Sequence, residues 1–268
     1  FPEIKRGLFL PLAGTSLWED DTLPKWEERP YDVVFTGNYT PLSKFEPTIE
    51  RHGKEYADFY YGIIEDFKKH PHLGMDIGIR EHLLSEVEDI TEDGVKEMMP
   101  NMIMIDLYVR NYFRGKVVQT LVDAGVSVHC FGAGWEFLPC EHPENLIKEG
   151  GVDSLACLQA LSKAKVSLNV MPWFKDGAHD RVFNSMLNGA VCFTDWSRYL
   201  TENLRDGEDI FFYELDALEC LPDMVQGILE NRKKWEHMQK AAYETAEKSH
   251  TWEHRAGAVH KEILSKIR

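Results

Sequence analysis

The stretch that decides the fold is VSLNVMPWFKDGAHDRVFNSMLNGAVCFTD, residues 166–195. It opens with an apolar run, passes through a polar loop that contains a glycine, continues at helical spacing from His179, and closes with a second apolar run. Both runs are apolar on both faces, which is typical of central strands in a parallel sheet. The stretch therefore predicts a strand, a helix and a second strand parallel to the first.

The same alternation extends in both directions along the chain. Further short apolar runs occur at 31–37, 126–132 and 209–213, with helix-period segments before and after them. Strands that alternate with helices in this way predict a doubly wound, Rossmann-like parallel sheet of the α/β class. We expect a single such domain over residues 31–268, preceded by an N-terminal extension or linker at 1–30.

One connection is too long for a simple crossover. Between the first two strands the sequence contains EYADFYYGIIEDFKKH and MIMIDLYVRNYFRGKVVQTLVDAG, both with apolar residues at helical spacing. A structureless loop of this length is uncommon in a compact domain, so we expect a helical insertion at about 41–112. The segment at about 216–268 is also expected to be helical.

Composition limits the possible partners and compartments. The 45 acidic residues exceed the 30 basic ones and give a formal charge of −15, which disfavours binding to nucleic acid. The chain has five cysteines, which is an odd number, and no two of them show C-x-x-C spacing. We therefore expect reduced thiols in a cytoplasmic protein. Apolar runs stay shorter than the roughly 20 residues of a transmembrane helix, so no membrane span is expected.

The loops that follow the predicted strands are the candidate ligand-binding segments. In a parallel sheet such loops lead into helix N-termini, whose free N–H groups suit phosphate. After the second strand, Gly132 and Gly134 resemble the start of a dinucleotide fingerprint, but Phe137 stands where the third glycine belongs. This departure argues against a nicotinamide-dependent oxidoreductase.

The loop inside the opening stretch has two interpretations. In the first, Gly177 lets the backbone approach a ligand, a helix begins at His179, and Arg181 in its first turn clamps an anionic group. In the second, the segment is an ordinary connector and Arg181 forms a surface ion pair. In both, Gly189 ends the helix before the next strand. The spacing alone does not separate the two.

A histidine pair near the C-terminus invites a metal-site hypothesis. His250 and His254 stand four residues apart, so a helix would place them on one face. The sequence offers no third ligand nearby, so we interpret them as residues of a solvated helix.

Beyond these patterns, the chain resembles a known family. VSLNVMPWFKDGAHDRVFNSMLNGAVCFTDWSRYL, together with YDVVFTGNY, GAGW, ALSKAKVSLNV and HTWEHRAGAVHKEIL in this order, resembles the C-terminal, nucleotide-sugar-binding half of GT-B glycosyltransferases, specifically the CgeB-like group. The resemblance implies that Gly7 to Gly14 is an interdomain linker and that the acceptor-binding N-terminal half is absent from this chain.

The resemblance also implies roles for individual residues. In retaining GT-B enzymes two acidic residues stand eight positions apart, and the matching residues here are Asp176, near the donor sugar, and Asn184, on the ribose. Asn184 keeps hydrogen-bonding ability without the charge, which leaves the stereochemistry of transfer open. His179 and Arg181 would face the diphosphate. The remaining implied residues would line the cleft or contact the base: Gly37, Asn38, Gly134, Gly151, Val152 and Gly177.

The expected function is therefore that of a donor domain. It would bind a nucleotide-diphosphate sugar for transfer to an unknown acceptor, with Asp176 and His179 as catalytic residues and without a cofactor. We expect no metal, because Arg181 and a helix N-terminus can neutralise a leaving diphosphate. We also expect the isolated chain to be incomplete for catalysis. The alternative is a non-catalytic nucleotide- or sugar-binding module.

Overall fold

The structure is a computed structural model that describes residues 7–18 and 22–267. Its centre is a six-stranded sheet in the order β3-β2-β1-β4-β5-β6, and every neighbouring pair is parallel. The strands are β1 (Tyr31–Thr36), β2 (Val128–Phe131), β3 (Leu146–Gly150), β4 (Ala164–Asn169), β5 (Val191–Asp195) and β6 (Phe211–Tyr213). The prediction of a Rossmann-like doubly wound sheet is confirmed.

The strand order creates a switch point in the middle of the sheet. From β1 the chain moves outward through β2 to β3, whereas from β4 it moves in the opposite direction through β5 to β6. Loops at the carboxyl ends of β1 and β4 therefore diverge and leave a crevice between them, which is the usual ligand site of this fold.

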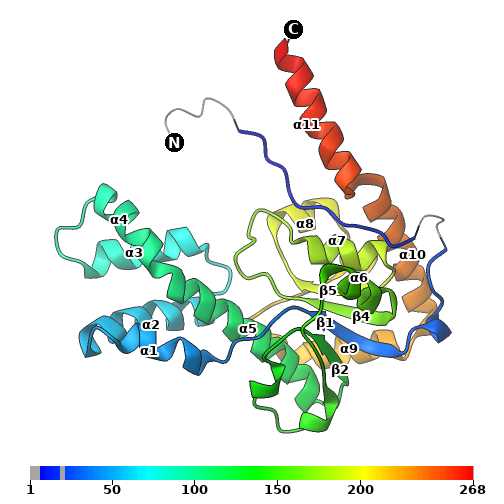
Figure 1. The fold of residues 1–268 in the computed structure, drawn as a ribbon, viewed down its shortest axis with the longest axis horizontal. Helices are drawn as coiled ribbons and strands as arrows, with labels where there is room; N and C mark the ends of the chain where they lie inside the picture. The colour runs from blue at the N-terminus through cyan, green and yellow to red at the C-terminus, as the bar shows by residue number, and fades with distance from the viewer. Residues whose placement is uncertain (1–6, 19–21, 268) are drawn as a thin grey trace.

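Helices cover both faces of the sheet, as Figure 1 shows. Alternate residues of β1 divide between the two layers: Val33 and Phe35 pack toward α5 and α9, while Val34 packs toward α6. All three side chains are fully buried, which explains why the strand sequence is apolar on both faces. The helices of the two layers are α5 (Ile103–Asp123), α6 (Ser154–Ser162), α7 (Asp180–Leu187), α8 (Arg198–Asn203), α9 (Leu221–Leu229) and α10 (Arg232–Ser249).

The long connection between β1 and β2 forms a helical lobe beside the sheet (Figure 1). The lobe contains α1 to α4 and the first half of α5, and its core includes Tyr60, Ile64 and Phe67 on one face of α2. Helix α5 runs on from the lobe to pack against β2 and α9, so it belongs to both parts. The other lobe helices are α1 (Glu46–Glu50), α2 (Lys54–Lys69), α3 (Met75–Glu86) and α4 (Glu92–Met98).

An N-terminal strap, residues 11–17, is tied to the α/β body. The Gly14 amide donates to the His250 carbonyl at 2.9 Å, and Arg255 Nε donates to the Pro11 carbonyl at 2.9 Å. The side chain of Asn188 binds the strap from α7 through two backbone groups. Residues 1–6 and 19–21 of the expected N-terminal extension lie outside the described residues.

The C-terminal segment is helical through α10 and α11 (Trp252–Ile267), and α11 extends away from the body (Figure 1). The interpretation of His250 as a solvated residue is wrong. This side chain is buried at the end of α10 and stacks on Phe183, with ring centroids 4.4 Å apart. Burial lowers the pKa of His250 to about 4, so the ring is neutral at pH 7.

Across the described part of the chain, no helix combines the length and the apolar composition that a membrane crossing requires. All five cysteines are free thiols, in agreement with the expectation from their number and spacing.

Candidate functional site

A switch-point hollow of about 270 Å³ lies between the carboxyl ends of β1 and β2 and the N-terminal parts of α6 and α7. It occupies the position that the strand order favours for a ligand. Backbone and side chains of both sheet halves contribute to it. Its lining residues are Thr36, Gly37, Asn38, Phe131, Gly132, Val152, Ser154, Cys157, Leu158, Leu161, His179, Asp180, Arg181 and Asn184.

Helix α7 presents its N-terminus to this hollow. His179 is the N-cap residue, and its Nδ1 lies 3.3 Å from the Arg181 amide nitrogen and 2.5 Å from Asp180 Oδ1. Since Nδ1 is engaged within the turn, Nε2 is the ring nitrogen that can meet a ligand. Burial lowers the pKa of His179, and the positive charges of Arg181 and Arg114 act in the same direction. A neutral imidazole is therefore expected at pH 7.

Asp180 balances part of the local positive charge. Burial opposes its ionisation, but the hydrogen bond with His179 and the nearby Arg181 bring its pKa below the ordinary value. The first turn of α7 thus carries one carboxylate, one neutral imidazole and one guanidinium.

Arg181 ties together the strand ends at the switch point. Its Nε donates to Asn169 Oδ1 at 2.9 Å, Nη1 donates to the Thr36 carbonyl at 3.1 Å, and Nη2 donates to the Val170 carbonyl at 3.2 Å. These acceptors are neutral, so the alternative in which Arg181 forms a surface ion pair is wrong. A guanidinium has five N–H donors, and three are used here. Two remain for an anion in the hollow.

Arg114 is a second arginine close to Arg181, although it does not line the switch-point hollow, and the sequence analysis missed it. Its Nη1 donates to the Asn38 carbonyl at 3.0 Å, while its buried Nε has no hydrogen-bond partner among the described residues. Burial lowers the pKa of Arg114 to about 10, and repulsion from the charge of Arg181 acts in the same direction. Two guanidinium groups that repel each other beside a hollow favour the arrival of an anion.

The loops after β1 and β2 are fastened to each other. The Gly37 amide donates to the Phe131 carbonyl at 2.8 Å, and Asn38 Oδ1 accepts from the Ala133 amide at 2.9 Å. Gly134 has a φ of +91°, and a Cβ there would lie 1.9 Å from the Tyr39 carbonyl oxygen. No residue but glycine fits this position. The loop that resembled a dinucleotide fingerprint therefore uses its second glycine for close packing of backbones.

The structure brings six of the expected site residues together in the switch-point hollow: Gly37, Asn38, Val152, His179, Arg181 and Asn184. The other four do not line it. Gly134 packs on Tyr39, and Gly151 is exposed. Asp176 and Gly177 line a separate loop hollow, of about 700 Å³, between the 173–177 loop, the start of α3 and α5.

The expected pair of Asp176 and Asn184 is thus divided between two hollows. Asp176 is exposed and forms an ion pair with Arg198 at 2.8 Å. Asn184 Oδ1 accepts from the Thr15 amide of the strap at 2.8 Å, and its Nδ2 lies 3.3 Å from Asp180 Oδ2. Both polar ends of the Asn184 side chain are therefore engaged within the protein.

Asp195, at the carboxyl end of β5, is another titratable group that the sequence analysis missed. Its Oδ1 accepts from the Met171 amide at 2.7 Å, whereas the buried Oδ2 has no partner among the described residues. Burial raises the pKa of Asp195 to about 6, although the Met171 amide and Lys175 favour the charged form. This carboxyl changes its charge close to physiological pH.

The described residues contain no group of three or more His, Cys, Asp and Glu side chains suited to hold a metal ion. The charged groups that converge at the switch point are the two arginines and Asp180. The arrangement is able to bind an anion of the size of a phosphate or diphosphate, with backbone N–H groups of α7 and guanidinium groups as donors.

Comparison with known proteins places the chain in a family. The family model described as "Glycosyl transferase-like" matches residues 114–261, which is more than half of the chain. The chain belongs to this family. The resemblance to glycosyltransferases is confirmed at this level. No curated protein matches the chain.

Several solved structures are similar at low identity. T4 phage BGT in complex with UDP-glucose is 15% identical with a TM-score of 0.47, over 92% of this chain and 52% of that one. TarM of S. aureus is 14% identical with a TM-score of 0.47, over 58% and 32%. Anabaena Alr3699/HepE in complex with UDP-glucose is 10% identical with a TM-score of 0.47, over 57% and 44%. The alignments span about a third to a half of these proteins.

Proposed function

We propose that this chain is the donor-binding half of a glycosyltransferase of GT-B architecture, of the CgeB-like group. It binds a nucleotide-diphosphate sugar in the switch-point hollow and works in the cytoplasm, where its free thiols stay reduced. The sugar is transferred to an acceptor hydroxyl. A partner domain supplies the other wall of the active-site cleft.

The observation that supports this proposal most strongly is the placement of Arg181 and of the α7 N-terminus at the switch-point hollow. Arg181 keeps two unused donors there, and Arg114, outside the lining, adds positive charge close to Arg181 and His179. Without a ligand this arrangement has uncompensated positive charge. A diphosphate compensates it and accepts the remaining hydrogen bonds.

The size of the hollow matches part of such a donor. Its volume of about 270 Å³ falls just below the roughly 300–1,000 Å³ of typical small-molecule pockets. We assign the diphosphate and ribose to it. The sugar then extends past His179 toward the 173–177 loop and Asp176. Val152, at the rim, is left for the base together with the backbone of Gly151.

The transfer step follows from this placement. The acceptor oxygen attacks the anomeric carbon of the donor sugar, the bond from that carbon to the phosphate oxygen breaks, and the nucleoside diphosphate leaves with the electron pair. The acceptor proton passes to a base or to water. Arg181, Arg114 and the α7 N-terminus stabilise the charge that develops on the leaving diphosphate. Neutral His179 donates or accepts a hydrogen bond through Nε2 near the sugar.

A second candidate is a nucleotide-binding module without catalysis. It is favoured by the engaged state of Asn184 and by the ion pair of Asp176 with Arg198, which leave neither side chain free for a donor. Nucleotide binding does not separate the two candidates. Release of free nucleoside diphosphate from a nucleotide sugar, with or without an acceptor, does.

Calorimetric titration with UDP, GDP and TDP tests the binding site. The loss of one charge-assisted contact, at about 1.5–3 kcal/mol, weakens affinity roughly tenfold to a hundredfold. We expect Arg181→Ala and Arg114→Ala each to show this loss for the nucleotide that binds best. Arg232→Ala is the matched control, because Arg232 is an exposed residue paired with Glu236 on α10.

Arg181→Ala also removes three hydrogen bonds to groups at the strand ends, which contribute to stability. The melting temperature of each variant must therefore be measured beside its titration. Arg114→Ala removes one described hydrogen bond, to the Asn38 carbonyl, and so separates binding from folding. A folded Arg114→Ala variant and a folded Arg181→Ala variant that both bind as tightly as the wild type would contradict the proposed site.

A further inference from the structure

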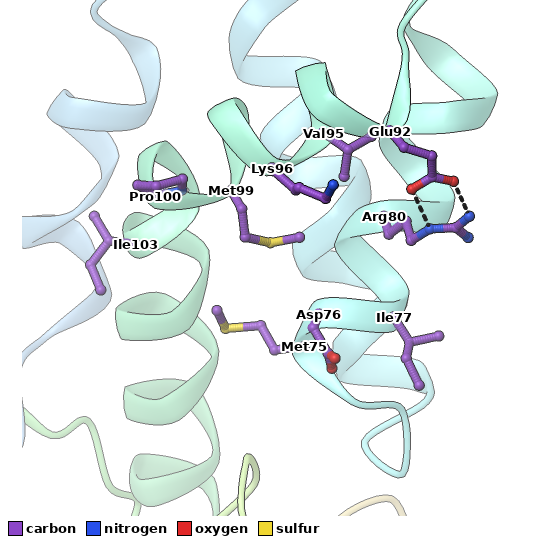
Figure 2. Close-up of a pocket in the computed structure, with 10 residues that line it drawn as sticks. All are labelled: Met75, Asp76, Ile77, Arg80, Glu92, Val95, Lys96, Met99, Pro100 and Ile103. Carbon is purple, nitrogen blue, oxygen red and sulfur yellow. Dashed lines mark hydrogen bonds and ion pairs between the residues drawn. The ribbon is translucent and has the colours of Figure 1, made fainter. Parts of the chain in front are cut away.

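The helical lobe contains a large cavity that the donor site does not use. This lobe pocket, of about 790 Å³, lies between α3, α4 and α5. Figure 2 shows the thioether side chains of Met75 and Met99 extending into the same space. Ile103, at the start of α5, also lines the pocket. Six of its lining residues are apolar: Met75, Ile77, Val95, Met99, Pro100 and Ile103.

Three of the four charged residues that line the pocket are paired, and Asp76 is the exception among the described ion pairs. Arg80 Nε donates to Glu92 Oε2 at 3.2 Å, and Figure 2 shows this pair at the edge of the space. Lys96 Nζ lies 2.8 Å from Asp93 Oδ1. The pocket therefore presents little net charge to a ligand. Yet Ile77 and Ile103 are 53% and 47% exposed, so apolar surface here faces solvent.

The lobe pocket adjoins the loop hollow. Met75, Asp76 and Ile77, at the start of α3, line both spaces. The loop hollow is polar by comparison: it contains Lys175, Asp176 and the ion pair of Asp106 with Arg110 at 2.5 Å. One ligand can therefore lie with an apolar part in the lobe and a polar part against the 173–177 loop.

We infer that these two spaces form the acceptor site and that the acceptor is an amphiphile, with an apolar chain and a hydroxyl-bearing polar head. This inference rests on the proposed function. The chain occupies the lobe pocket among Met75, Met99 and Ile103. The head lies in the loop hollow against the 173–177 loop, toward which the donor sugar extends past His179.

The polarity of the two spaces favours this occupant over others. Methionine side chains adapt to irregular apolar chains without a fixed shape requirement. The Asp76 carboxylate and the Lys175 ammonium both line the loop hollow and neither has a described ion pair, so the hollow selects neither an anionic nor a cationic head. A neutral, hydroxylated head group meets both conditions.

Octyl β-D-glucoside, held below its critical micelle concentration, is the probe. The protein is labelled at the methionine methyl groups and titrated while the NMR signals of Met75 and Met99 are followed. We expect these two signals to shift. We also expect octyl glucoside to bind at least tenfold more tightly than butyl glucoside, because the longer chain removes more methylene groups from water.

Matched variants locate the site. Ile77→Asp places a charge in the pocket at an exposed position, and Ile263→Asp is the control, since Ile263 on α11 is exposed to a similar extent, 51% against 53%. We expect Ile77→Asp to bind octyl glucoside at least tenfold more weakly and the control to bind as the wild type does. Equal affinities of the variants, absence of shifts at Met75 and Met99, or binding only to phosphatidylcholine vesicles would overturn the inference.

Titration of the same variants with UDP, GDP and TDP separates this inference from the proposed function. We expect Ile77→Asp to bind nucleotide as the wild type does. Nucleotide binding without glucoside binding rejects the amphiphile and leaves the donor site. If the wild type and all the variants bind the glucoside but none binds a nucleotide, the donor site is rejected. The amphiphile can then no longer be assigned as an acceptor.

Discussion

At the scale of single residues, the site depends on charges that are buried without full compensation. Arg114 and Arg181 lie near each other beside the switch point, and Asp195 lies at the end of the next strand. Each of these groups has a pKa displaced by burial toward its neutral form. Such displaced groups concentrate at functional sites because binding and catalysis need charges that respond to a ligand.

Asp195 makes the stability of the protein depend on pH. Its pKa is raised from 3.8 to about 6, so between these values the folded state binds more protons than the unfolded state. Stability therefore falls as pH rises from about 4 to 6, by up to about 3 kcal/mol. Asp195→Asn should lack this component, and we expect its free energy of unfolding to exceed that of the wild type by more at pH 7 than at pH 4.

Urea unfolding at several pH values measures this difference. The comparison between the variant and the wild type removes the contribution of His250, whose lowered pKa makes both proteins lose stability as pH falls from 6.5 toward 4. Two curves that stay parallel between pH 4 and 7 would show that Asp195 is not perturbed in this way.

At the scale of elements, α7 connects the candidate site with the N-terminal strap. Its first turn faces the switch-point hollow, and the end of the helix holds the strap through Asn188. Asn188 Nδ2 donates to the carbonyls of Thr15 and Asn184, both at 2.8 Å, and Oδ1 accepts from the Leu17 amide at 3.0 Å. One buried side chain therefore fastens the strap to the helix.

Asn188→Ala should release the strap. Three hydrogen bonds are lost, so we expect the free energy of unfolding to fall by about 2–4 kcal/mol. Limited proteolysis should cut within residues 11–17 faster than in the wild type. Asn203→Ala is the control, because exposed Asn203 bonds only the Tyr199 carbonyl in its own helix among the described contacts. Identical cleavage rates in all three proteins would refute the role of Asn188.

The sequence allowed most elements to be predicted, with two informative exceptions. β3, LIKEG at 146–150, has only two apolar residues and lies at the sheet edge, where burial does not impose an apolar pattern. The expected end of the insertion near residue 112 falls inside α5, because this helix packs on α2 with one part and on β2 with another. Helical periodicity does not show where a continuous helix changes its packing partner.

Some of the site residues could be predicted from their position beside the predicted strand ends. Gly37, Asn38 and Arg181 follow or adjoin strand ends, and a parallel sheet brings such loops to one edge. Arg114 lies in the middle of α5, where a single arginine resembles any surface residue of an amphipathic helix. Its neighbour Asn38 is 76 positions away in sequence, and only the folded chain brings them together. The contact of α3 with the 173–177 loop was hidden for the same reason.

At the scale of the whole molecule, the proposal gives donor binding to the α/β body, and a helical lobe stands beside the loop that would face the donor sugar. The lobe, inserted between β1 and β2, meets the 173–177 loop at the start of α3. In our account the body holds the diphosphate and the lobe holds the acceptor. Binding of donor should need no metal, since the two arginines carry the positive charge.

The most direct test is a crystal structure of the protein with the nucleoside diphosphate that binds best, prepared with a chelator. We expect both phosphates in the switch-point hollow, with phosphate oxygens within hydrogen-bond distance of the guanidinium groups of Arg181 and Arg114 and of the first amides of α7. A nucleotide seated in the loop hollow or the lobe pocket would contradict this expectation, as would a nucleotide that binds only after a divalent metal is restored.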